Sequence, residues 1–106
     1  MVDHELDDLK REFLAEAEEK AREMQAALEA ERTRDSLERL TYLAHQLKGS
    51  GGSYGFAKIS ADAAEIERAV ESLVDLESDA GVEERIQQHV ISLRSEIDRR
   101  IKELAR

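Results

Sequence analysis

The residues best suited to chemistry gather around His45, in the stretch AHQLKGSGGSYGF that spans residues 44–56. If this stretch is helical and Leu40 marks the direction of the core, His45 points roughly 140° away, toward solvent. Near pH 7 an imidazole is largely neutral, and one ring nitrogen keeps a free lone pair. Such a nitrogen can accept a phosphoryl group and pass it on without an added base.

The helical neighbours of His45 are unusual in a chain otherwise rich in strong helix formers. Thr41 lies one turn before it, and Lys48, Gly49 and Gly52 follow on the same face. Each glycine inside a helix costs about 1 kcal/mol relative to alanine, so a compensating role is expected. Glycines next to an exposed side chain leave room for another molecule, whereas Gly51 faces the core side and is expected to allow close helix packing.

The local charge favours binding of an anionic group. The whole chain of 106 residues has a net charge of −9, yet no Asp or Glu occurs from Arg39 to Ala61, which carries +3. An acid-free patch around an exposed histidine suits a phosphoryl group. Elsewhere the cations alternate with acids, so the chain is not expected to bind nucleic acid or an anionic membrane.

Composition indicates an all-α fold. Pro, Trp and Cys are absent, aromatic residues make up 4% of the chain, and Ala, Leu, Glu and Arg dominate. Without cysteine there is no disulfide, no thiol catalysis and no cysteine-ligated zinc. Without a long apolar run there is no predicted transmembrane span or signal peptide, so the expected location is the cytoplasm.

Four apolar stripes with helical spacing predict an antiparallel up-and-down four-helix bundle, with residues 1–106 as a single domain. The first stripe is Leu6, Leu9, Phe13, Ala17, Met24 and Leu28. The second is Leu37, Leu40, Ala44, Leu47 and Gly51. The third is Ile59, Ala63, Ile66, Val70 and Leu73. The fourth is Val82, Ile86, Val90, Leu93, Ile97, Ile101 and Leu104, with Ile91 pointing the other way.

Helix ends are predicted from capping residues. Asp3 is the expected N-cap of the first helix, and Asp35 with Glu38 forms an expected capping box for the second. Gly55 is expected to end the second helix. Ser78 or Asp79 is expected to cap the fourth.

The motif resembles that of a known family. His45, Leu47, Lys48, Gly49 and Ser50 match the H-x-L-K-G-S phosphoacceptor motif of histidine-containing phosphotransfer domains, which are four-helix bundles of two-component signalling. The following run GSYGF, residues 52–56, looks most like the amino-terminal phosphotransfer domain of chemotaxis histidine kinases. The resemblance covers most of residues 5–75. The further helix usual in that kinase domain is missing here, so both a trimmed kinase domain and a separate phosphotransfer protein stay open.

The resemblance also implies roles for individual residues. His45 would be the phosphoacceptor, and Glu67 matches the position of the residue that holds the other ring N–H in the family. Lys48 would offset charge on the phosphoryl oxygens. Gly49, Gly52, Thr41, Tyr42 and Gln46 would form the docking surface.

The implied partners are a response regulator receiver domain and a histidine kinase catalytic domain. No cofactor or metal of its own is expected, because Mg²⁺ would come with the partner's active site. The chain is too short for a complete ATP-using kinase and lacks a GxxxxGK[ST] motif, so it should not phosphorylate itself from ATP. We expect the isolated domain to be a monomer.

Two other classes of protein fit the sequence less well. A carboxylate-bridged metal bundle needs Glu-x-x-His pairs, but Tyr42 and Ile86 stand three residues before His45 and His89. A helical adaptor without chemistry would explain the bundle but not the glycines. His4 is expected to be inert, and His89 to be a hydrogen-bonded histidine at the edge of the core.

Overall fold

The structure is a computed structural model that describes residues 2–30, 33–74 and 80–105. These residues form four α-helices: α1 (Val2–Glu29), α2 (Arg34–Ser53), α3 (Ala57–Val74) and α4 (Ala80–Leu104). No strand occurs in the described ranges. The all-α class predicted from composition is therefore confirmed.

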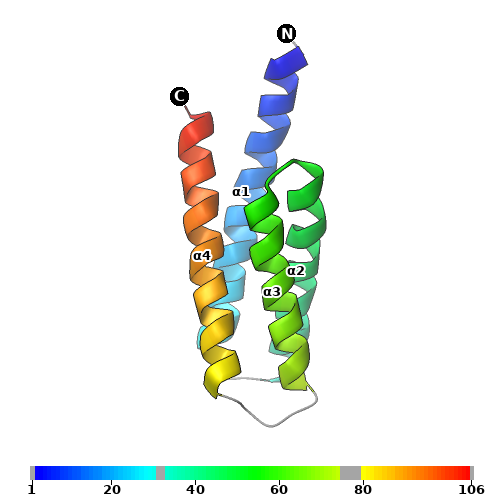
Figure 1. Ribbon diagram of the computed structural model, residues 1–106, viewed down its shortest axis with the longest axis vertical. Helices are drawn as coiled ribbons and strands as arrows, with labels where there is room; N and C mark the ends of the chain where they lie inside the picture. The colour runs from blue at the N-terminus through cyan, green and yellow to red at the C-terminus, as the bar shows by residue number, and fades with distance from the viewer. Residues whose placement is uncertain (1, 31–32, 75–79, 106) are drawn as a thin grey trace.

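The helices pack as a bundle in which each contacts the next and α1 also contacts α4 (Figure 1). Figure 1 shows the first turn of α1 and the last turn of α4 at one end of the bundle. The four helices thus form a closed ring, in which α2 and α3 lie side by side, as do α1 and α4. The face between α2 and α3 is the one that carries His45.

The core consists of the apolar stripes. All five predicted residues of α3 are buried, as are four of the five in α2 and four of the seven in α4. The remaining members, Leu37, Val82, Ile101 and Leu104, are partly buried against the core. The prediction missed four buried apolar residues, which widen the stripes: Leu14, Ala21, Leu43 and Ala69. Ile91 points outward as predicted, with 58% of its surface exposed.

The start of the first stripe was predicted wrongly. Leu6 and Leu9 are 44% and 47% exposed rather than buried. The start of α1 extends past the adjoining ends of α2 and α3 (Figure 1). Leu6 and Leu9 precede Phe13, which stacks on Tyr54 and Phe56 at the turn between those helices, so α2 and α3 do not cover them. A periodic pattern identifies the apolar face of a helix, but it does not show how far the neighbouring helices reach.

Two predicted N-caps were also wrong. α1 already includes Asp3, and α2 is capped by Thr33 rather than by Asp35. The Thr33 side chain accepts from the Ser36 backbone N–H at 3.0 Å, and Ser36 Oγ accepts from the Thr33 N–H at 3.0 Å. Serine thus takes the place of the Glu in the usual capping box. The predicted caps Ser78 and Asp79 lie outside the described residues.

The end of α2 is formed at Gly55, as predicted from the sequence. Gly55 has φ +82°, a conformation that favours glycine, and its N–H donates to the Gly52 carbonyl at 3.1 Å. The Phe56 N–H donates to the Gly51 carbonyl at 2.8 Å. These two bonds form a Schellman motif, which turns the chain sharply into α3. Phe56 is then buried and stacks on Phe13, with ring centroids 5.7 Å apart.

None of the four helices has the length and apolar character needed to cross a bilayer, as far as the described residues extend.

Candidate phosphoacceptor site

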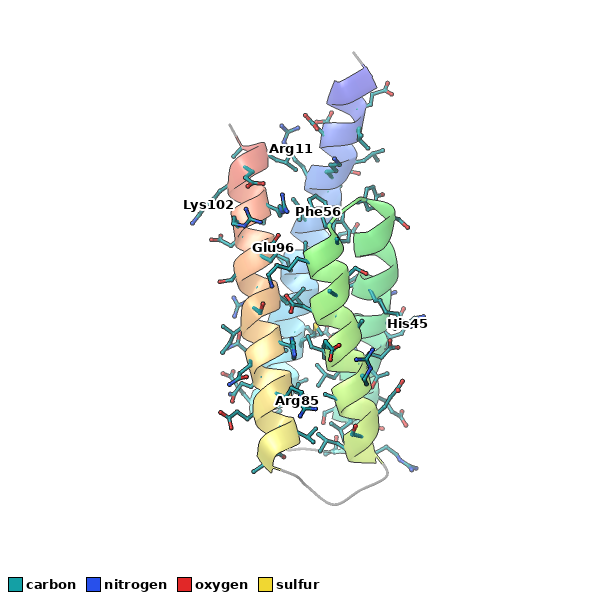
Figure 2. The ribbon with its side chains drawn as sticks, viewed as in Figure 1. Arg11, His45, Phe56, Arg85, Glu96 and Lys102 are labelled. Atoms are coloured by element: carbon teal, nitrogen blue, oxygen red, sulfur yellow. The ribbon has the colours of Figure 1, made fainter. Side chains whose placement is uncertain are left out.

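His45, Lys48 and Glu67 meet on the face between α2 and α3, and we call these three residues the His45 cluster. His45 Nδ1 lies 2.9 Å from Glu67 Oε2, and Lys48 Nζ donates to Glu67 Oε1 at 2.6 Å. The His45 side chain is 67% exposed, whereas the Glu67 side chain is 15% exposed. Figure 2 shows His45 on the outer side of the bundle, away from α4. One ring nitrogen is therefore held at the carboxylate while much of the ring stays open to solvent.

The charge state of Glu67 fixes the direction of these hydrogen bonds. The Lys48 hydrogen bond, helped by the one to His45, holds the pKa of Glu67 below its ordinary value despite partial burial. An ionised carboxylate only accepts hydrogen bonds, so His45 Nδ1 must carry the proton that lies between them. In the neutral ring the lone pair then belongs to Nε2.

Close packing of α2 on α3 positions this cluster. A Cβ added to Gly51 would lie 3.2 Å from the Ser60 backbone nitrogen and 3.3 Å from Ile59 Cγ2. Ser60 Oγ also donates to the Lys48 carbonyl at 2.7 Å. These contacts confirm that Gly51 serves helix packing, and they set the separation that lets α3 present Glu67 to His45.

The two glycines after His45 differ from Gly51. A Cβ at Gly49 would meet no atom within 4 Å, and one at Gly52 would lie 3.7 Å from Ser60 Oγ, an ordinary contact. Both residues are exposed. Packing within the chain therefore does not require glycine at either position, and the surface one turn after His45 is left without a side chain.

The comparisons with known proteins agree with this geometry. The family model described as "Hpt domain" matches residues 8–104. The chain belongs to the Hpt domain family. No curated protein and no solved structure gives a significant match to it. Hpt domains are phosphorelay modules of two-component signalling that partner with receiver domains and histidine kinases, so this Hpt domain has a phosphorelay role.

The predicted docking residues lie around His45 in the Hpt domain, but they differ in exposure. Tyr42 is 51% exposed, while Thr41 and Gln46 are partly buried. The Thr41 hydroxyl donates to the Leu37 carbonyl at 3.0 Å within its own helix, and Gln46 Nε2 donates to the Tyr42 hydroxyl at 2.8 Å.

Sequence reasoning missed two contacts that tie α2 to its neighbouring helices. One is Ser60, which ties α3 to the Lys48 backbone. The other is an ion pair between Arg39 on α2 and Glu23 on α1. Neither had a signal in the sequence, because a single serine in a helix and one glutamate in an acidic helix are both commonplace.

No group of three or more potential metal ligands occurs within the described ranges of the Hpt domain. Beside the His45 cluster lies a shallow hollow of about 290 Å³. It is lined by Lys48, Ala64, Glu67, Arg68 and Glu71.

Proposed function

We propose that His45 is the phosphoacceptor of this Hpt domain and that the phosphoryl group is carried on Nε2. The observation that supports this most is the Nδ1 contact to Glu67 at 2.9 Å, on a side chain that is otherwise 67% exposed. The carboxylate holds the tautomer whose lone pair points away from the protein. A partner can then approach that nitrogen in line.

The transfer step balances without a further base. The Nε2 electron pair attacks the phosphorus of an aspartyl phosphate on a receiver domain, or the γ-phosphorus of ATP held by a kinase domain. The bond from phosphorus to the leaving oxygen breaks, and aspartate or ADP departs with that electron pair. The Nδ1 proton stays between His45 and Glu67, so the carboxylate offsets the positive charge that develops on the ring. In the return step a receiver aspartate attacks phosphorus, and the P–N electrons go back to Nε2.

Lys48 would act on the phosphoryl group itself. Its ammonium group donates a hydrogen bond to Glu67, and the side chain, one turn from His45, is 39% exposed. A charge at this place would attract the phosphoryl oxygens as they arrive and would slow loss of the group afterwards. The Mg²⁺ required for transfer would belong to the partner's active site.

Gly49, Gly52, Thr41, Tyr42 and Gln46 would form the surface on which a partner settles. The open space at Gly49 and the exposed surface at Gly52 support this role, because the two glycines follow His45 at i+4 and i+7 on its face of α2.

We also propose which type of Hpt domain this is. The GSYGF run favours the chemotaxis-kinase type of Hpt domain, in the cytoplasm and together with a histidine kinase catalytic domain and a response regulator. The contacts of each helix with the next, closed by α1 on α4, support an antiparallel up-and-down arrangement.

The test is incubation with the small phosphodonor phosphoramidate, followed by intact mass and by transfer to purified receiver domains of the source organism. We expect one added phosphoryl group, lost in mild acid and mapped to His45 by fragmentation. Absence of the added mass, together with no transfer from a phosphorylated receiver, would favour a plain adaptor. A stoichiometric bound metal in the purified protein would instead favour a metal bundle.

A further inference from the structure

On the edge of α2 that faces α1, Tyr42 is held in place from two sides. The Arg39 guanidinium carbon lies 5.4 Å from the Tyr42 ring centroid, a cation–π distance. Gln46 Nε2 donates to the Tyr42 hydroxyl at 2.8 Å. Arg39 and Gln46 stand at i−3 and i+4, so both lie on the Tyr42 face of the helix.

Arg39 is itself fixed by a second helix. Its guanidinium makes two hydrogen bonds to the Glu23 carboxylate on α1, one of them from Nη2 to Oε1 at 3.1 Å. The Arg39 bond also keeps the pKa of Glu23 below its ordinary value. The planar, fork-like arginine can bind a carboxylate with two hydrogen bonds and stack on a ring at the same time, whereas lysine has neither the planar group nor the fork. α1 thus determines where the Tyr42 ring stands.

This arrangement leaves an apolar ring in a polar surface. Tyr42 is 51% exposed, and it borders a groove of about 870 Å³ between α1 and α2. The groove also carries the charged residues Glu16, Glu19, Lys20, Arg22, Glu23 and Arg39. The Tyr42 hydroxyl accepts a hydrogen bond from Gln46, so its own proton can be donated to a bound partner.

The position of Tyr42 determines which binding partner can cover it. Tyr42 is three residues from His45, which places the two Cβ atoms about 5–6 Å apart on one helix face. A specific interface covers about 800 Å² on each partner, a patch of roughly 15 Å radius. A receiver domain that brings its aspartate to His45 therefore covers Tyr42 as well.

From these contacts we infer that the Glu23–Arg39 pair holds Tyr42 as a preformed aromatic anchor for the receiver domain. The receiver would contribute an aliphatic side chain against the ring and a hydrogen-bond acceptor for the hydroxyl. An anchor that is already ordered loses little conformational freedom on binding, and buried aromatic residues near the centre of an interface contribute most to affinity. The inference rests on the proposed function of His45. Arg39 and Glu23 are positioning residues in it, since they act through Tyr42.

The experiment measures phosphoryl transfer from the phosphorylated chain to the receiver that accepts fastest, over a range of receiver concentrations. The rate of phosphoramidate labelling is measured for each variant in parallel, and the rate of transfer to the receiver is divided by that labelling rate to give a ratio. We expect Tyr42→Ala to raise the half-saturating receiver concentration about tenfold or more, with a smaller change in the maximal rate. Tyr42→Phe should stay within about threefold, because the ring and its stacking are retained.

The positioning residues give the sharper test. Arg39→Lys and Glu23→Gln should each raise the half-saturating concentration about threefold to tenfold, although neither needs to touch the receiver. In the Tyr42→Ala background these changes should have little further effect, because their route of action is gone. Lys102→Gln, which removes one exposed charge near the end of α4, should leave the ratio unchanged.

Two results would overturn the proposal that Tyr42 is an anchor for the receiver domain. One is an unchanged half-saturating concentration in Tyr42→Ala. The other is a dimer in sedimentation that Tyr42→Ala dissociates, which would assign the ring to a second copy of this chain. Failure of the proposed function looks different, because phosphoramidate would then label no variant and the wild type would not be labelled either.

Discussion

His45 and His89 each direct Nδ1 toward a carboxylate of α3, and each carboxylate also binds a lysine. For His45 the partners are Glu67 at 2.9 Å and, through it, Lys48. For His89 the carboxylate is Asp62 at 3.2 Å, which also accepts from Lys58 at 3.0 Å and from Ser92 at 2.9 Å. We call His89, Asp62, Lys58 and Ser92 the His89 cluster.

The two clusters differ in access. The side chains of His45 and His89 are 67% and 29% exposed, and those of Glu67 and Asp62 are 15% and 9% exposed. The residue at i+4 also differs: it is the open Gly49 after His45 and the fully buried Leu93 after His89. The pattern of histidine, carboxylate and lysine therefore serves well for joining two helices. What marks His45 as a candidate for chemistry is the open surface around its ring.

The strongest test of this comparison exchanges each histidine for glutamine. We expect His45→Gln to abolish phosphoramidate labelling and His89→Gln to retain it, since of these two rings that of His45 is the more open to a donor. Circular dichroism should show the same helix content in His45→Gln as in the wild type, because the outward side chain contributes little packing. Labelling that survives in His45→Gln, or that moves to His89, would mean that exposure does not select the acceptor.

The second test fills the open surface after His45. We expect Gly49→Gln to slow transfer to a receiver by about a hundredfold, because the in-line approach to Nε2 tolerates little displacement. Its unfolding free energy should stay level or rise by about 0.5 kcal/mol, since glutamine is a better helix former than glycine. Ser95→Gln, at an exposed position on α4, is the control and should transfer normally. A normal rate in Gly49→Gln would show that the space at Gly49 is not the approach route.

The third test concerns stability. Asp62 is buried and accepts hydrogen bonds from three side chains. Hydrogen bonds to charged groups contribute about 1.5–3 kcal/mol, so Asp62→Asn should lower the unfolding free energy by about 2 kcal/mol. Glu67→Gln should lower it less, because Glu67 accepts from two side chains rather than three and is itself more exposed than Asp62, but it should alter the tautomer preference of His45. Chemical denaturation and nitrogen NMR of the ring measure the two effects. An equal loss of stability in both variants would remove the proposed division between a structural and a functional cluster.

Much of the fold could be predicted because each local signal was consistent with the bundle. The α3 stripe from Ile59 to Leu73 is buried at every predicted position, and Gly55 adopts the conformation expected of it. The errors lie where a second element decides the outcome. Leu6 is exposed because it lies before Phe13, the residue that contacts the turn between α2 and α3, and Leu43 is buried because the core face of α2 is wider than its stripe.

The candidate site shows the same limit. His45 could be singled out from its own helix, since periodicity alone places it outside and glycines follow it. For Glu67 the family resemblance supplies the position and the wheel angle agrees with it, but wheel angles of separate helices do not by themselves reveal which residues meet. The Arg39–Glu23 pair and the His89 cluster depend on contacts between helices whose side chains are individually ordinary. Such contacts become visible only when the helices are placed together.

The smallest expected effect separates Lys48 from Lys58 by acid titration. The hydrogen bond from Lys48 lowers the pKa of Glu67, so its contribution to stability is complete above the ordinary glutamate pKa. That contribution is lost as the pH falls through the lowered pKa, because the carboxyl group is then protonated in both folded and unfolded chains. Lys48→Ala should therefore raise the pKa of Glu67 toward its ordinary value, followed by carbon NMR of its side-chain carboxyl. The stability difference between this variant and the wild type should shrink toward zero in acid. Lys58→Ala, which acts on Asp62 across α3, should leave the Glu67 titration in place. If Lys58→Ala moves that titration as far as Lys48→Ala does, the two clusters form one coupled network, and the contrast between them fails.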